Sequence, residues 1–168
     1  MTKAQYARMT ERTRAVVARL PGGARSLHFP TLLCALCYFA ALLYLLVQKD
    51  ARLIRAVLVP AACFLLVTAL RPLIGRERPY DHFGVLPVGS YRPGKGKSMP
   101  SRHTASACAI ACAVVYVWPN LPVALAMGAL CLIIAALRVL SGQHYTSDVL
   151  AALVLSLAVS GLGYFLIG

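Results

Sequence analysis

Five long apolar runs limit the fold of this chain more than any other feature of the sequence. They occupy residues 31–48, 53–70, 104–118, 121–137 and 149–167. Each has roughly 15 to 19 residues, close to the ~20 that cross the hydrocarbon core of a bilayer as a helix. The runs contain no Asp, Glu, Lys or His, and Arg55 is their only arginine. A chain of 168 residues is too small to bury five such helices in a soluble core, so the runs predict transmembrane helices.

The composition agrees with this prediction. Hydrophobic residues make up 60% of the chain and the mean hydropathy is +0.72, whereas soluble domains are about half apolar. We therefore predict an all-α integral membrane bundle of about five transmembrane helices, formed by residues 30–168. The six cysteines all lie inside the apolar runs. This placement is typical of packing residues and not of a disulfide framework or a zinc site.

Residues 1–29 form a separate basic segment with Glu11 as its single acidic residue. Residues 4–20 have the pattern of an amphipathic helix that lies on a membrane surface, and Pro21-Gly22-Gly23 would end it. A disordered basic tail is the alternative. The net charge of +12 is carried almost entirely outside the apolar runs, so we expect membrane lipid headgroups as partners and not nucleic acid.

Two longer polar pieces, residues 71–103 and 138–148, interrupt the apolar runs. Two predicted transmembrane helices separate one piece from the other. Because an even number of crossings returns the chain to its starting side, both pieces are predicted to lie on the same face of the membrane.

Cationic side chains gather in these two pieces. They are Arg71, Arg76, Arg78, Arg92, Lys95, Lys97, Arg102 and Arg138. Arginine presents a charged planar fork that matches phosphate oxygens. Ser101 stands where the helix of residues 104–118 would begin, and free N–H groups at a helix N-terminus also bind anions. The cluster predicts a phosphate site, although Arg76, Arg92, Lys95 and Lys97 are equally well interpreted as residues that face lipid headgroups.

Two histidines and one carboxylate could supply chemistry to this site. A neutral imidazole is a competent nucleophile, and its ordinary pKa of about 6.5 suits proton transfer. His144 and Asp148 are four residues apart, so one helical turn would bring the carboxylate to the ring, where it would orient the imidazole. His103 stands beside Arg102. We expect no metal ion or other cofactor, because the many cations would repel a metal and no HExxH motif is present.

Three segments resemble the motifs of the type 2 phosphatidic acid phosphatase (PAP2) superfamily, which are commonly written K-x6-RP, PSGH and SR-x5-H-x3-D. The corresponding segments here are RPLIGRERP, PSRH and LRVLSGQHYTSD. All the spacings are kept. The departures are Arg71 in the lysine place, Arg102 in the glycine place and Leu137 in the serine place, for which Ser141 is a possible substitute.

The resemblance implies a role for each matching position. His144 would attack phosphorus and form a phosphohistidine, and Asp148 would orient it. His103 would protonate the leaving alcohol and then activate water. The substrate phosphate would be bound by Arg71, Arg78, Ser101, Arg102 and Arg138.

The expected function is therefore that of a membrane lipid phosphatase acting on a lipid phosphomonoester or diphosphate. Phosphatidic acid, phosphatidylglycerol phosphate and a polyprenyl diphosphate are the candidate substrates. A catalytically silent protein that binds lipid phosphates is the main alternative, while a transporter and a vanadate-dependent haloperoxidase fit less well. We expect a multi-pass protein of the cell membrane. The basic N-terminal segment shares the face of the site, but the charge distribution leaves open which side that is, and the sequence leaves the oligomeric state open.

Overall fold

The computed structural model describes residues 1–93 and 97–166 of the chain. These residues form helices and no strands. The elements are α1 (Lys3–Ala18), η1 (Gly23–His28), α2 (Phe29–Val47), α3 (Arg52–Ile74), α4 (Pro79–Phe83), α5 (Arg102–Val117), α6 (Leu121–Leu140), α7 (Thr146–Gly161) and η2 (Leu162–Leu166). Four stretches, which contain α2, α3, α6 and α7, are long and apolar enough to cross a membrane, and α5 is a shorter apolar helix. The prediction of an all-α membrane bundle is confirmed.

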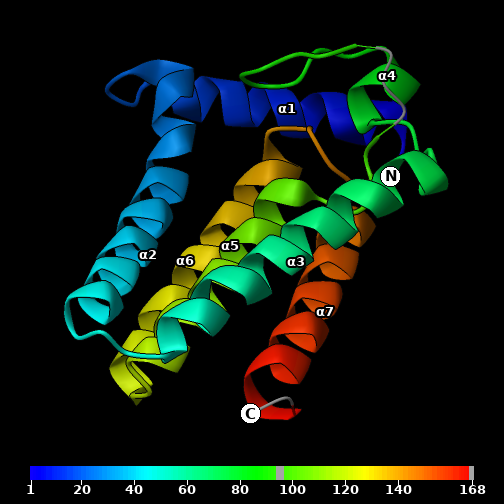
Figure 1. Ribbon diagram of the computed structural model, residues 1–168. Helices are drawn as coiled ribbons and strands as arrows, with labels where there is room; N and C mark the ends of the chain where they lie inside the picture. Colours follow the sequence, from blue (N-terminus) through cyan, green and yellow to red (C-terminus); the bar gives the residue numbers. More distant parts are fainter. Residues whose placement is uncertain (94–96, 167–168) are drawn as a thin grey trace.

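Helix α5 lies at the centre of the bundle and packs against α2, α3, α6 and α7 (Figure 1). Its buried positions are mostly small residues, among them Ala105, Ala109 and Ala113. Small side chains let neighbouring helices approach closely, which is how transmembrane helices gain packing energy where lipid removes the hydrophobic drive.

The outer faces of the bundle carry large apolar side chains. Phe39, Leu58, Leu132 and Leu157 are all more than half exposed. A continuous apolar exterior of this kind is stable only in lipid. The protein is therefore a multi-pass membrane protein.

Both polar pieces of the sequence lie at one end of the bundle. The end of α3, the start of α5, the end of α6 and the start of α7 all meet there (Figure 1). The prediction that the two pieces share a face is confirmed. Helix α5 has 16 residues and begins inside this end of the bundle, beneath α1 (Figure 1).

The basic N-terminal segment is helical and not a disordered tail. Helix α1 begins with a capping box in which Thr2 and Gln5 satisfy each other's backbone N–H groups. Gly22, which precedes η1, and Gly23, its first residue, both have positive φ. Helix α1 lies across the end of the bundle that holds the polar pieces (Figure 1).

Candidate active site

His144 lies in the turn between α6 and α7, with only 3% of its surface exposed. Its Nδ1 atom is 3.5 Å from Oδ2 of Asp148, which is in the first turn of α7. The helical spacing predicted this contact. Since Nδ1 faces the carboxylate, Nε2 is the ring atom that remains to meet a substrate.

Asp148 is fully buried and is held by groups from three segments of the chain. Arg76 donates to Oδ1 at 2.8 Å, while Ser98 donates to Oδ2 at 2.5 Å and the N–H of Tyr145 donates to Oδ2 at 3.0 Å. A carboxylate that accepts several hydrogen bonds is fixed in both position and charge. It can therefore orient the imidazole of His144 and stabilise positive charge on it.

Sequence reasoning missed Ser98 and did not predict that Arg76 pairs with Asp148. The interpretation of Arg76 as a residue that faces headgroups is wrong, because its guanidinium pairs with Asp148, donates to Ser147 at 2.7 Å and lies 4.3 Å from the centre of the Tyr145 ring. Arg76 stands in the variable part of the first motif and Ser98 two residues before the second, so the motifs gave no signal for either. Lys95, from the same cationic group, lies outside the described residues.

The protonation state of His144 follows from its surroundings. Burial lowers the pKa of this histidine below its ordinary value of about 6.5, and the positive charges of Arg78 and Arg71 act in the same direction. The contact with Asp148 opposes both effects. The ring is therefore neutral near pH 7, which is the state that a nucleophile requires.

Two buried arginines come from different helices, and Arg71 acts electrostatically on His144 while Arg138 acts on His103. Arg71, in the last turn of α3, is 5% exposed and donates to the backbone carbonyl of Lys97. Arg138, in the last turn of α6, is 7% exposed and donates to Oε1 of Gln143 at 2.8 Å. Within the described part of the chain, neither forms an ion pair with a carboxylate. Buried guanidinium groups without such partners favour the binding of an anion.

The remaining predicted phosphate ligands surround the same point. Arg78 precedes α4 and is half-buried, and Arg102 is the first residue of α5. Both are close enough to Arg71 to act on it electrostatically. Ser101 is fully buried at the N-cap of α5, and its backbone N–H donates to the carbonyl of Asp148. The positive end of the α5 dipole thus points into the cluster.

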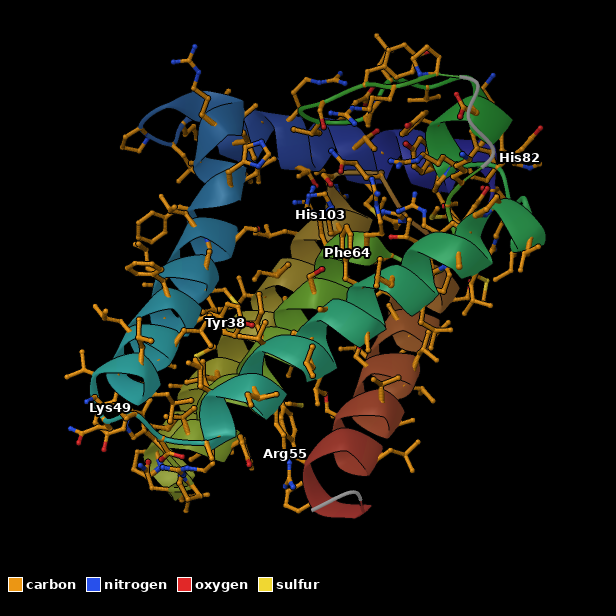
Figure 2. The ribbon with its side chains drawn as sticks, in the orientation of Figure 1. Tyr38, Lys49, Arg55, Phe64, His82 and His103 are labelled. Atoms are coloured by element: carbon orange, nitrogen blue, oxygen red, sulfur yellow. The ribbon has the colours of Figure 1, made fainter. Side chains whose placement is uncertain are left out.

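His103 lies one residue further along α5 and is exposed. It stands among the polar side chains at the α1 end of the bundle, whereas Lys49 and Arg55 lie at the opposite end (Figure 2). Arg138 and His144 are near enough to His103 to act on it electrostatically. The structure thus brings together, at one end of the bundle, all eight residues that the sequence singled out.

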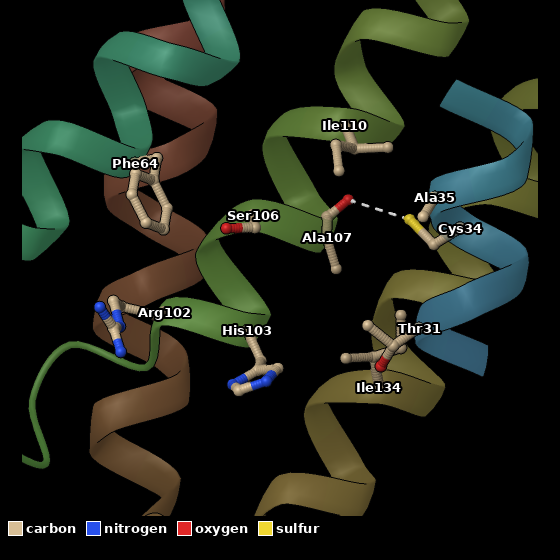
Figure 3. A pocket seen from close by; sticks show the side chains of 10 residues that line it. All are labelled: Thr31, Cys34, Ala35, Phe64, Arg102, His103, Ser106, Ala107, Ile110 and Ile134. Carbon is tan, nitrogen blue, oxygen red and sulfur yellow. Dashed lines mark hydrogen bonds between the residues drawn. The ribbon is translucent and has the colours of Figure 1, made fainter. Parts of the chain in front are cut away.

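A groove of about 310 Å³ runs from His103 and Arg102 into the bundle. Its walls come from α2, α3, α5 and α6, and they become apolar away from the two polar residues (Figure 3). Cys34, Phe64, Ile110 and Ile134 are among the apolar lining residues. A ligand with a polar head and an apolar tail fits a cavity with this distribution of groups.

Ser141, the possible substitute for the serine that Leu137 replaces, is buried at the end of α6. The hydroxyl of Ser141 donates to the backbone carbonyl of Arg138 at 3.4 Å, at the end of α6.

Among the described residues, no group of three or more His, Cys, Asp or Glu side chains has the arrangement of a metal site.

The sequence model of the PAP2 superfamily matches residues 52–167, which is more than half of the chain. The chain belongs to the PAP2 superfamily. The matched residues include all three motif segments, so the resemblance is confirmed, while α1 and α2 precede the match.

Two relatives of this PAP2 protein are the lipid A 1-phosphatases of Rhizobium etli and Rhizobium johnstonii. Each is 38% identical to it over 93 residues, which are 53% of this chain and 39% and 37% of the two relatives. The chain thus matches well under half of the length of these relatives.

A solved structure has the same fold. The crystal structure of a transmembrane PAP2 type phosphatidylglycerolphosphate phosphatase from Bacillus subtilis superimposes with a TM-score of 0.70 and 22% sequence identity, over 96% of this chain and 83% of that one. At this level of identity the likeness establishes the fold.

Proposed function

We propose that this PAP2 protein is a membrane lipid phosphatase that removes phosphate from a lipid phosphomonoester or diphosphate through a phosphohistidine. The observation that carries the proposal is a buried His144–Asp148 pair at the end of the bundle that also holds the buried guanidinium groups of Arg71 and Arg138. Residues 30–168 would be the catalytic domain and the cell membrane its location.

In the first step, Nε2 of His144 attacks phosphorus while the bond between phosphorus and the leaving oxygen breaks. Asp148 stabilises the positive charge that develops on the ring. His103 donates a proton to the leaving alcohol or phosphate, and the negative charge of the bound phosphate favours the protonated ring that this requires. The equatorial oxygens face Arg71, Arg78, Arg138 and the N-terminus of α5, which stabilise the charge of the transition state.

In the second step, water attacks the phosphohistidine. His103, now neutral, takes one proton from the water, and the bond between phosphorus and Nε2 breaks. Inorganic phosphate leaves, and His144 returns to its neutral form. Every proton moves between water, substrate and the two histidines, so the proposed cycle needs no metal ion.

The groove beside His103 supports a lipid substrate. A phosphate held by the arginines would place the attached lipid at the mouth of the groove, so that its first methylene groups enter the apolar part. The candidate substrates are phosphatidic acid, phosphatidylglycerol phosphate and a polyprenyl diphosphate, and the names of the Rhizobium relatives add lipid A 1-phosphate.

Phosphate release tests the proposal. Detergent-purified protein is incubated with these four lipids in the presence of EDTA, and His144→Ala is the inactive control. We expect release from at least one lipid that survives EDTA and disappears in the variant. Lipid phosphate binding without release from any of the four would favour the alternative, a catalytically silent lipid-phosphate-binding protein.

A further inference from the structure

Helix α1 lies outside residues 52–167, the part of the chain that matches the PAP2 superfamily, yet it packs against the loop that carries His144. Its buried residues are Tyr6, Thr10 and Val17, all on one face of the helix. The first two point at Gly142, which precedes His144 by two residues. A surface helix anchored only by lipid would not bury polar side chains against such a loop.

The contact between Tyr6 and Gly142 is specific. Tyr6 is fully buried, and its hydroxyl donates to the carbonyl of Gly142 at 2.8 Å. Gly142 has φ +74°, and a Cβ atom on it would lie 2.4 Å from the Tyr6 hydroxyl and 2.8 Å from Cγ2 of Thr10. Only glycine combines this backbone conformation with so close an approach.

Aromatic rings extend the same contact to the far side of His144. The ring of Tyr6 lies 5.2 Å from that of Phe83 in α4, and Phe83 lies 6.5 Å from Tyr145. Arg14 of α1 also donates to the carbonyl of Leu86 at 3.1 Å, just beyond α4. The residues on both sides of the histidine are therefore tied to α1.

Most other backbone hydrogen bonds of the loop are local to the end of α6, where the N–H groups of Ser141 and Gly142 donate to the carbonyls of Leu137 and Val139 at 2.9 Å each. The N–H groups of Gln143 and His144 share one acceptor, the carbonyl of Arg138, at 3.2 Å each. The carbonyl of Ser141 accepts from Val88 at 2.9 Å. Shared bonds of this length are weaker than a single bond at 2.8 Å. The bond from the Tyr6 hydroxyl to the carbonyl of Gly142 is thus the shortest hydrogen bond that another helix makes to the backbone of the loop in the described structure.

We propose that Tyr6 is a positioning residue for His144: its hydrogen bond to Gly142 fixes the loop so that the imidazole stays aligned with Asp148 and with the bound phosphate. The consequence for catalysis rests on the proposed function. Small displacements of a nucleophile lower its rate of attack steeply, whereas substrate binding depends on arginines to which α1 makes no hydrogen bond among the described residues.

Tyr6→Phe tests this by removing one hydroxyl group. Tyr38→Phe is the matched control, because the hydroxyl of Tyr38 also donates to a backbone carbonyl, that of Ala56, at 2.9 Å, within the bundle and away from the site. With the best lipid substrate, we expect Tyr6→Phe to lower kcat by roughly 3- to 10-fold with KM unchanged, the loss of one ordinary hydrogen bond. Tyr38→Phe should change neither.

A single-turnover experiment separates positioning from loss of folded protein. With labelled lipid phosphate, the amplitude of phosphohistidine formation counts the folded enzyme, while its rate reports the alignment of His144. Tyr6→Phe should lower the rate and keep the amplitude. A lower amplitude at an unchanged rate would assign Tyr6 a purely structural role and overturn the proposal.

Hydrogen exchange tests whether Tyr6 positions the loop that carries His144, and it does not require an active protein. The amides of residues 142–144 should exchange faster in Tyr6→Phe than in the wild type and in Tyr38→Phe. Unchanged exchange in Tyr6→Phe would overturn the proposal even for a protein that releases no phosphate. If the variant exchanges faster but the wild type releases no phosphate, only the proposed function would be contradicted. Thr10→Ser, which removes only the methyl group beside Gly142, should give the same changes to a smaller extent.

Discussion

The guanidinium of Arg76 and the carboxylate of Asp148 form an ion pair at 2.8 Å in which the aspartate is fully buried. This pair joins the end of α3 to the start of α7 behind the imidazole of His144. A buried carboxylate that keeps such a partner stays ionised and fixed. The pair therefore holds the carboxylate of Asp148 rigidly beside Nδ1 of the histidine.

Replacing Arg76 should damage catalysis and leave substrate binding intact. We expect Arg76→Met to lower kcat by about 10- to 100-fold, the effect of losing a hydrogen bond to a charged group, with little change in KM. Arg76→Lys should lose less, since it keeps the charge but not the geometry. Steady-state kinetics measure this. A residue that only faced headgroups would instead change KM alone.

The substitution Arg71→Met should lower the activity of the protein without lowering its stability. The substitution removes a buried charge that forms no ion pair in the described structure, so the unfolding temperature in detergent should stay the same or rise. The loss of one phosphate ligand should lower kcat/KM by about 100-fold or more. Arg55→Met, the same change at the other end of α3, is the control and should keep full activity. A large fall in unfolding temperature with activity retained would contradict a role for Arg71 in phosphate binding.

The stability of the protein should depend on His144 at acidic pH. Because burial lowers the pKa of this histidine in the folded state, the unfolded state binds more protons once the pH falls below about 6.5. Stability from this group is complete above that pH and is lost as the pH falls, by at most about 1.4 kcal/mol per pH unit. Unfolding at pH 7.5 and 5.5 should therefore show a steeper loss in wild type than in His144→Gln. His82→Gln, at an exposed histidine, should behave as wild type, and equal slopes in all three proteins would refute the prediction.

A substitution that fills the groove should weaken the binding of long-chain substrates more than that of short-chain ones. Ala35 of α2 lines the groove and is exposed, so Ala35→Phe can block the groove without disturbing the core. Loss of contact with two or three methylene groups should raise KM for a long-chain phosphatidic acid by roughly 10-fold or more. A soluble short-chain analogue should be much less affected. Ala40→Phe, on the same helix but outside the groove, is the control, and equal effects of the two variants would place the lipid tail elsewhere.

Much of this architecture could be predicted from local sequence patterns. Membrane helices follow from runs of apolar residues, because lipid forces each backbone to satisfy its own hydrogen bonds. The common face of the two polar pieces follows from counting crossings. The contact between His144 and Asp148 was predicted from their four-residue spacing, although His144 lies in the turn before α7. In each case the relevant residues are neighbours in the chain or are related by helix geometry.

The partners of Asp148 and of the His144 loop could not be predicted in this way. Arg76 is 72 residues from Asp148, Ser98 is 50 residues from it, and Tyr6 is 136 residues from Gly142. An arginine, a serine and a tyrosine at such distances look like any other polar residues of a membrane protein. Their contacts exist because α3, α7 and α1 meet at one end of the bundle, and that meeting depends on how helices pack around the small residues of α5. The apolar runs and motif spacings of the sequence thus determined which groups would do the chemistry, and only the packing of the helices decided what holds those groups in place.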